Sequence, residues 1–336
     1  MSKIRHILLV AMLALAAASC QRRPLVEEDL SVLLKLDIDY NIPNYAGAKS
    51  AQHMRTSFYD LSSEELRHFD ITGMEGGIIH IPAGNYKMLV YNMGTELTRI
   101  RHNDNYSTAE AYTNEISRAL LGQLKHYLST RQELLNLKDV APASGHTPEI
   151  DDEPTRLDER IVYTPNHLFV ARNEQVDIPV RIEGDEPVVI EATARSVVES
   201  WYLEVRGVSG IENIGTVSAL ITGMVGSNII ASDTRTEEAV TIYEEMGTNA
   251  QERHLTTIFN TFGKQSSERN ILSVVITDVA GGQYQYNFDI SNQFLNNPER
   301  RIIVTTDIDI PKPEYGGGGF KPSVDDWDEE HTDIEL

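Results

Sequence analysis

The only cysteine of this 336-residue chain, Cys20, stands at the end of the stretch with the clearest chemical signature. The preceding segment, 1–19, begins with the positive charges of Lys3 and Arg5 and continues with an apolar run over 7–18. A positive start, a short apolar run and small residues before a cleavage point are typical of a secretory signal. Twelve apolar residues are too few for a membrane-spanning helix, which needs ~20. A lone thiol cannot form an internal disulfide, so it is a candidate for covalent modification.

Small residues directly before this cysteine make the segment resemble a bacterial lipoprotein signal. The resemblance implies cleavage between Ser19 and Cys20, a diacylglyceryl thioether on Cys20 and acylation of the new N-terminus, with palmitate as a typical chain. It also implies attachment to the outer membrane, on either the periplasmic or the external face. Acidic residues at 27–29 are similar to surface-export signals, but a plain solvated linker explains them equally well. The other interpretation of the whole segment is an ordinary signal with a chance cysteine.

The remaining candidates for chemistry are weak. The sequence has no His-Glu-x-x-His, no Gly-x-Ser-x-Gly, and no phosphate-binding loop, since the glycines of 316–319 lack a following lysine and helix. Asp37-x-Asp39 and Asp307-x-Asp309 pair carboxylates at strand spacing, where solvated strand faces are expected more often than Ca²⁺ ligands or general acids. We therefore expect no catalytic residue, no metal ligand and no cofactor, and a protein that is not an enzyme.

The charge balance narrows the class of partner. Lysine and arginine number 29 and aspartate and glutamate 51, a formal net charge of −22. Such a net charge disfavours nucleic acid and bare anionic lipid as partners. A membrane contact is expected to run through the lipid on Cys20.

The pattern of apolar residues predicts two folded units. Residues 32–40 alternate as one strand, and 81–92 places a Pro-Ala-Gly turn before a strand buried on both faces. A four-residue apolar repeat predicts one amphipathic helix over about 108–137, attached to the first unit. The expected organisation, in residue numbers, is a signal at 1–19, a tether at 20–31, an N-terminal β-sandwich with the helix at 32–140, a linker at 141–158, a C-terminal β-sandwich at 159–311, and a flexible, glycine-rich acidic tail at 312–336.

The second half of the chain is predicted to be strand after strand. The expected strands are 168–170, 176–182, two within 187–206, 218–224, 255–262, 270–278, 284–290 and 301–310, with a hairpin turn at Gly281-Gly282. Many short strands between turn signals favour an antiparallel sandwich.

Several of these segments resemble a family. The Pro-Ala-Gly-x-Tyr turn at 82–86, the strand ending Tyr91-Asn92, and the motifs at 194–198, 220–224 and 261–263 resemble Bacteroidetes fimbrillin-like proteins, in particular fimbrial anchor and accessory subunits of the Mfa2/FimB type. The resemblance implies two transthyretin-like antiparallel β-sandwich domains, a place in the fimbrium, a role in cell adhesion, and fimbrial subunits as partners.

In pilins of this family a cut after an arginine releases the first strand. Arg55 is the candidate for such a cut here, although anchor-type members keep the strand and stay lipidated. We therefore expect a non-enzymatic, lipid-anchored cell-envelope protein that acts in attachment or assembly. The alternative is a surface glycan-binding lipoprotein in which Trp201 and Trp327 form stacking platforms.

Overall fold

The computed structural model describes residues 30–47, 52–130, 147, 159–180 and 186–313. This part of the chain is mainly β with one α-helix, which confirms the predicted fold class at that level. The strands are β1 (Leu30–Asp39), β2 (His53–Asp60), β3 (Leu66–Gly73), β4 (Gly76–Ile81), β5 (Gly84–Asn92), β6 (Thr98–Arg101), β7 (Glu110–Thr113), β8 (Arg160–Tyr163), β9 (Phe169–Ile178), β10 (Val188–Ser196), β11 (Glu199–Arg206), β12 (Ile214–Val225), β13 (Ser227–Ile229), β14 (Thr234–Arg235), β15 (Ala239–Glu245), β16 (Gly247–Asn249), β17 (His254–Thr261), β18 (Ile271–Asp278), β19 (Gln283–Asp289) and β20 (Arg301–Thr305). The helix is α2 (Arg118–Thr130), and two short 3₁₀ helices are η3 (Ile211–Asn213) and η4 (Ser291–Phe294).

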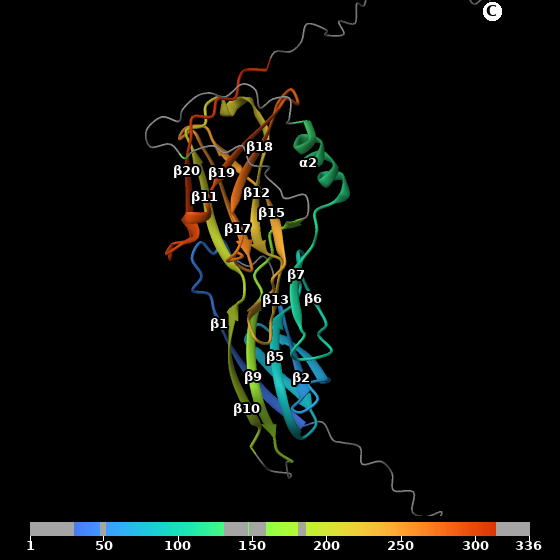
Figure 1. The fold of residues 1–336 in the computed structure, drawn as a ribbon. Helices are drawn as coiled ribbons and strands as arrows, with labels where there is room; N and C mark the ends of the chain where they lie inside the picture. The colour runs from blue at the N-terminus through green and yellow to red at the C-terminus, as the bar shows by residue number, and fades with distance from the viewer. Residues whose placement is uncertain (1–29, 48–51, 131–146, 148–158, 181–185, 314–336) are drawn as a thin grey trace, which may run out of the picture.

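The molecule is elongated and consists of two units joined end to end (Figure 1). In the first unit, β1 closes a barrel with the strand order β1-β10-β9-β5-β2-β3-β4. It pairs with β10 in parallel over eight residue pairs and with β4 in antiparallel over six. Leu34 and Leu36 point into the barrel while Lys35 and Asp37 point out, as the alternation predicts, but Tyr40 is exposed beyond the strand and not buried with them.

Strand β5 is buried on both faces, as its sequence predicts. Met88 and Val90 lie in the barrel core, while Leu89 and Tyr91 face a second cluster outside the barrel. The barrel core consists of Val32, Leu34, Leu36, Met54, Phe58, Ile79, Ile81, Tyr86, Met88, Val90, Phe169, Ala171, Val176, Ile178, Ile190 and Ala194.

The strand pairing does not follow the expected division of the chain at 141–158. Strands β9 and β10 come after that segment in the sequence, yet they pair with β5 and β1 and complete the barrel. Strand β8, between them and the segment, pairs with β15 of the second unit. The units are therefore interleaved, because the chain enters the second unit at β8, returns to the barrel for β9 and β10, and leaves it again at β11.

The second unit packs two sheets face to face. A four-stranded sheet, β16-β17-β11-β20, and a five-stranded sheet, β19-β18-β12-β15-β8, share one core. The strands that contribute most to that core are β11, β12 and β18, with residues such as Leu203, Ile221 and Val274. The predicted turn before β19 is present, with Gly281 at φ +89° and the Asp278 carboxylate accepting the N–H groups of Ala280 and Gly282. The expectation of purely antiparallel sheets is wrong, because β1–β10, β11–β20 and β15–β8 are parallel.

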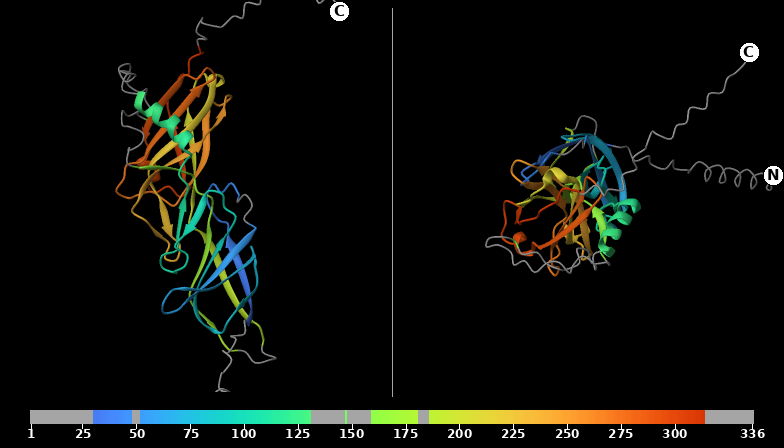
Figure 2. Two further views of the ribbon diagram at one scale, coloured as in Figure 1. Left: turned by 90° about the vertical axis from the view of Figure 1, so that its right-hand side faces the viewer. Right: turned by 90° about the horizontal axis from the view of Figure 1, so that it is seen from above.

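The helix differs from its prediction in extent and in place. It begins at Arg118, after Ser117, whose hydroxyl accepts the N–H of Leu120. Residues 110–113, expected in its first turn, form β7, and 131–137 lie outside the described residues. The helix packs on the second unit and not on the first (Figure 2), because Leu124 and the preceding Ile116 are buried in a cluster with Ile161, Leu220, Tyr243 and Val275.

Candidate functional site at the junction of the two units

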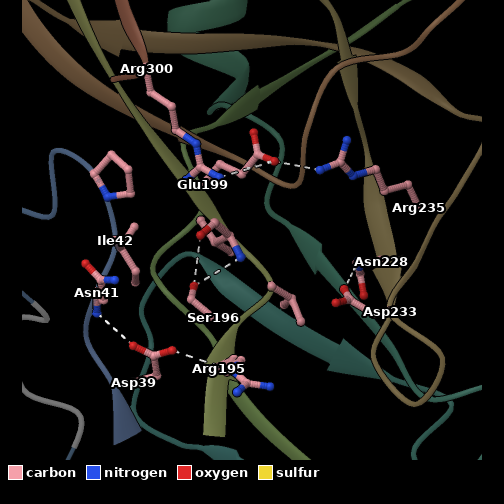
Figure 3. A pocket seen from close by; sticks show the side chains of 13 residues that line it. Asp39, Asn41, Ile42, Arg195, Ser196, Glu199, Asn228, Asp233, Arg235 and Arg300 are labelled. Carbon is pink, nitrogen blue, oxygen red and sulfur yellow. Dashed lines mark hydrogen bonds and ion pairs between the residues drawn. The ribbon is translucent and has the colours of Figure 1, made fainter. Parts of the chain in front are cut away.

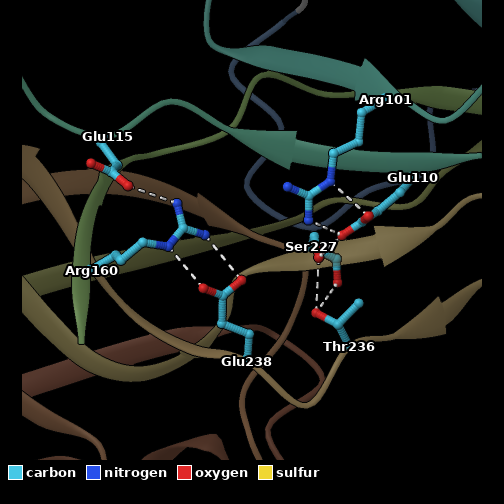
Figure 4. A network of polar contacts seen from close by, with 7 residues as sticks. All are labelled: Arg101, Glu110, Glu115, Arg160, Ser227, Thr236 and Glu238. Carbon is cyan, nitrogen blue, oxygen red and sulfur yellow. Dashed lines mark hydrogen bonds and ion pairs between the residues drawn. The ribbon is translucent and has the colours of Figure 1, made fainter. Parts of the chain in front are cut away.

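A small sheet ties the two units together. Its strand order is β14-β13-β7-β6, so that β7 of the β6–β7 hairpin, which follows β5 in sequence, pairs with β13 of the second unit. Across this sheet the Arg101 guanidinium donates to both Glu110 carboxylate oxygens, at 2.7 and 2.6 Å, and the Ser227 hydroxyl donates to Glu110 Oε1 at 2.5 Å (Figure 4). Arg101 holds the pKa of the buried Glu110 carboxyl below its usual value. A charged group with this many partners fixes β6 and β7 against β13.

A second ion-pair group lies beside the first (Figure 4). The Arg160 guanidinium donates to both oxygens of Glu238, at 2.8 and 3.0 Å, and to Glu115 at 3.1 Å. Glu115 precedes α2, so this group connects the segment before the helix to β8 and to the segment before β15.

His167 lies where the chain passes from β8 to β9. Its Nδ1 is 2.9 Å from the Ser196 hydroxyl, at the end of β10, and its Nε2 is 2.7 Å from the Ser200 hydroxyl in β11. The backbone carbonyl of His167 also accepts the side-chain N–H of Asn92. Burial, with a smaller contribution from the Arg300 charge, lowers the pKa of His167 to about 4. The neutral imidazole therefore connects the two segments in which the chain passes between the units, β8–β9 and β10–β11.

The Ser196–His167 contact does not have the character of a nucleophile and its base. The Ser196 hydroxyl donates to the carbonyl of Val198 and accepts its N–H, which makes a tight turn between β10 and β11. A general base works best with a pKa near the operating pH, and burial moves that of His167 well below neutrality. These hydrogen bonds are therefore structural, and we call His167 with Ser196 and Ser200 the His167 lock.

A cavity of about 280 Å³ opens beside this lock (Figure 3). Its lining residues come from both units: Asp39, Asn41, Ile42, Pro43, Arg195, Ser196, Val197, Val198, Glu199, Asn228, Asp233, Arg235 and Arg300. Arginines and acids alternate around it, with Arg235 2.6 Å and Arg300 3.7 Å from Glu199, and Arg195 3.6 Å from Asp39. A lining of paired opposite charges suits polar contacts with a protein chain and offers no excess of one charge to a small ion.

The neutral His167 predicts a specific dependence of stability on pH. Its folded pKa, about 4, lies below the ordinary 6.5, so between these values the unfolded chain binds more protons and the free energy of unfolding falls as the pH is lowered. Over that interval the loss is about 3 kcal/mol at most. We expect urea titrations between pH 4 and 7 to show this slope in the wild type and a flatter one in His167→Gln. The exposed His80→Gln is the control and should keep the wild-type slope, and parallel profiles for His167→Gln and wild type would contradict the assignment.

Of the sequence-predicted site residues that lie in the described part of the chain, Arg55 lies within the barrel. It belongs to β2, where it pairs with Ile71 of β3 and Tyr91 of β5, and Thr56 beside it is fully buried. Its guanidinium stacks over the Phe69 ring at 3.9 Å from the centroid. A protease needs its substrate segment extended and unpaired, so this position disfavours a cut after Arg55 in the folded chain. Ser19 and Cys20 lie outside the described residues, so their assignment stays a prediction.

The alternative of a glycan-binding surface would need Trp201 as an exposed stacking platform. Trp201 is buried, its ring lies 4.6 Å from that of Phe294, and its indole N–H donates to Glu199. Trp327 lies outside the described residues. Of the two carboxylate pairs, Asp37, Asp307 and Asp309 are exposed, and the half-buried Asp39 is 3.6 Å from Arg195. Within the described ranges no group of three or more histidine, cysteine, aspartate or glutamate side chains is placed to hold a metal ion, and no helix is long and apolar enough to cross a membrane.

Sequence reasoning missed the junction residues, among them Glu110, His167 and Ser227. Glu110 falls within the range predicted as helix, and its hydrogen-bond partner Ser227 lies 117 residues away. The sequence held one weak signal. Arg101 and Glu110 carry opposite charges on either side of segment 102–109, as paired residues of a β-hairpin often do.

The chain is similar to proteins described as fimbrial subunits and adhesins. It is 23% identical, over 96% of its length and 95% of the relative's, to the "Putative fimbrium anchoring subunit Fim4B" of Bacteroides ovatus. A crystal structure titled as a putative adhesin from Bacteroides ovatus has the same fold, with a TM-score of 0.57 and 20% identity over 88% of this chain and 98% of that one. The fimbrial anchor protein Mfa2 from Porphyromonas gingivalis aligns with a TM-score of 0.47 and 13% identity, over 82% and 90%. The model of a family described as domain of unknown function DUF5119 matches residues 19–245. The chain therefore belongs to the DUF5119 family.

Proposed function

We propose that this protein is a lipid-anchored subunit of the cell envelope that anchors or helps to assemble a fimbrium. The observation that carries the proposal is the match to a fimbrium anchoring subunit over nearly the whole of both chains. The lone Cys20 after a lipoprotein-like signal supplies the attachment, and two or more acyl chains give lasting membrane binding. We further propose that the anchor sits in the outer membrane, that the two β units are transthyretin-like domains, and that the protein catalyses no reaction.

The place of β1 supports an anchor rather than a processed pilin. It pairs on both edges inside the barrel, and the candidate cleavage site at Arg55 is held in the middle of a sheet. We propose that the chain keeps β1 and stays attached through the residues before it. The mixed-charge junction cavity is then a surface to which a fimbrial subunit binds by polar contacts.

Replacement of Cys20 by serine tests the attachment. Without the thiol no thioether forms, so we expect most of the protein to move from the membrane fraction to the soluble fraction after cell breakage and centrifugation. Ser19→Ala, which keeps a small residue before the cysteine, is the matched control and should stay with the membrane. Equal retention of Cys20→Ser and wild type would refute lipid anchoring.

Mass spectrometry of the purified wild-type protein tests the retention of β1. We expect an N-terminal peptide that begins at Cys20 and carries lipid. A mature chain that begins at Thr56 would contradict the anchor and favour a polymerising pilin. Co-purification of a fimbrial subunit from solubilised envelopes tests the fimbrial role, and its absence under conditions that recover Fim4B with its own fimbrium would count against that role.

A further inference from the structure

The outer surface of the barrel is covered on one side and bare on the other. Over β2 and β5, outward side chains such as Tyr59 and Leu89 are fully buried beneath the segment that contains Tyr106. Over β3, β4 and β10, by contrast, the apolar side chains that point outward are exposed: Phe69 by 47%, Ile71 by 49%, Ile78 by 64% and Val189 by 44%.

Together with Leu33, these exposed side chains form one row across four neighbouring strands, β10, β1, β4 and β3. In β1 the half-buried Leu33 pairs with Ile78 of β4 on one side and with Val189 of β10 on the other. Ile71 of β3 and Ile78 of β4 are both on the outward face, and each lies two residues from the Gly73–Gly76 pair that joins the two strands. Ile71 in turn pairs with Arg55 of β2. We call Leu33, Phe69, Ile71, Ile78 and Val189 the outer patch.

The outer patch has polar boundaries along the strands. Two residues after Leu33 in β1, Lys35 pairs with Gly76 of β4 and Glu191 of β10. Its ammonium is 3.2 Å from the Glu191 carboxylate. Two residues before Leu33, Ser31 pairs with His80 of β4. Contiguous apolar surface with a polar rim is typical of a contact with a protein or a membrane and unusual on a bare monomer surface.

The outer patch lies near the point where the chain enters the barrel. Strand β1 begins at the end of the barrel away from the second unit (Figure 1), and its first residue, Leu30, is three residues from Leu33. The ten residues 20–29 span at most about 35 Å when fully extended. A lipid on Cys20, as proposed above, would therefore keep the outer patch within reach of the bilayer at all times.

We propose that the outer patch rests on a phospholipid surface, with Arg55 at the end of the row binding lipid phosphate. Apolar side chains enter the boundary between headgroups and acyl chains, where a guanidinium stacked on an aromatic ring is also well placed. The contact lays the side of the barrel against the membrane and fixes the direction in which the second unit and the junction cavity point. The inference rests on the proposed lipid anchor, and it assigns a role to the arginine whose cleavage the fold disfavours.

An environment-sensitive fluorophore on a single cysteine tests the contact without relying on Cys20. A chain of residues 21–336 has no cysteine, so Ile78→Cys, Val189→Cys and the control Val279→Cys, exposed on the second unit, each take one label. A hexahistidine tag before residue 21 holds each labelled chain on vesicles of phosphatidylethanolamine and phosphatidylglycerol with a nickel-chelating lipid. We expect emission to rise about twofold or more at positions 78 and 189, with quenching by brominated lipid, and no change at 279.

Two variants test which side chains make the contact. The double variant Ile71→Ser/Ile78→Ser, with the label at 189, should lose the rise in emission, and Arg55→Gln should weaken it on vesicles with phosphatidylglycerol. Labels at 78 and 189 that stay in water on the tethered chain would overturn the proposal. So would protection that appears only when a fimbrial subunit is added, because the outer patch would then be a protein-binding surface. Neither outcome affects the anchoring test at Cys20, since the tether here is artificial.

Discussion

Removal of strand β1 is expected to unfold the barrel of the first unit. Three of its side chains, Val32, Leu34 and Leu36, are buried in the barrel core, and each contributes about 2 kcal/mol on burial. Their loss takes about 6 kcal/mol from a domain whose total stability is about 5–15 kcal/mol. It also leaves β10 and β4 with unpaired edges over eight and six residues. Thermal unfolding followed by circular dichroism on a chain that begins at residue 40 should show no cooperative transition for the barrel.

A peptide of residues 30–39 added in trans shows whether the strand itself is what is missing. We expect it to restore the transition, because the groove between β10 and β4 specifies an alternating apolar strand. The same peptide with Leu34→Asp and Leu36→Asp is the matched control and should fail. If the truncated chain unfolds at the wild-type temperature, the barrel does not depend on β1. An anchor that keeps β1 would then gain nothing in stability from it.

Many of the longer strands could be predicted from local sequence, but β2, β3, β4 and β15 were not. β1, β5, β18 and the β18–β19 turn follow from alternation, from apolar content and from glycine at positive φ, which all act between residues close in the chain. Partners could not be predicted. Val32 pairs with Val188, 156 residues later, and nothing in either strand identifies the other. The proline-rich segment at 141–158 predicted a domain boundary, but the chain returns to the barrel after it.

The misplaced helix has a similar cause. Tyr112 and Ile116 fit the four-residue repeat that α2 continues, so the sequence extended the helix back to about 108. In the structure Ala111 pairs with Ile100 on one side and with Asn228 on the other. The backbone hydrogen bonds of a strand with partners on both edges outweigh a helical propensity of a few tenths of a kcal/mol per residue. Those partners come from different units, which is why the junction residues escaped prediction.

Arg101→Met is expected to loosen the tie between the two units. Methionine keeps an unbranched side chain but removes both hydrogen bonds to the buried Glu110 and the guanidinium that lies over the Tyr112 ring. The carboxylate then retains only the Ser227 hydroxyl, and a buried charge left without its partner costs about 3 kcal/mol. Urea unfolding at pH 7 should show this loss.

The pH dependence separates the ion pair from simple packing. In the wild type Arg101 lowers the pKa of Glu110, so its contribution to stability is present above the ordinary 4.5 and is lost as the pH falls. In Arg101→Met the unpaired carboxyl should have a raised pKa, so the deficit relative to wild type should shrink below pH 4.5, where protonation removes the charge. The double variant Arg101→Met/Glu110→Leu removes both partners and should recover most of the loss at pH 7, because no buried charge is left. Equal deficits for the single and double variants at every pH would show that the loss does not come from the unpaired Glu110 charge. The two units would then be held together by the backbone pairing of β7 with β13 and by the His167 lock.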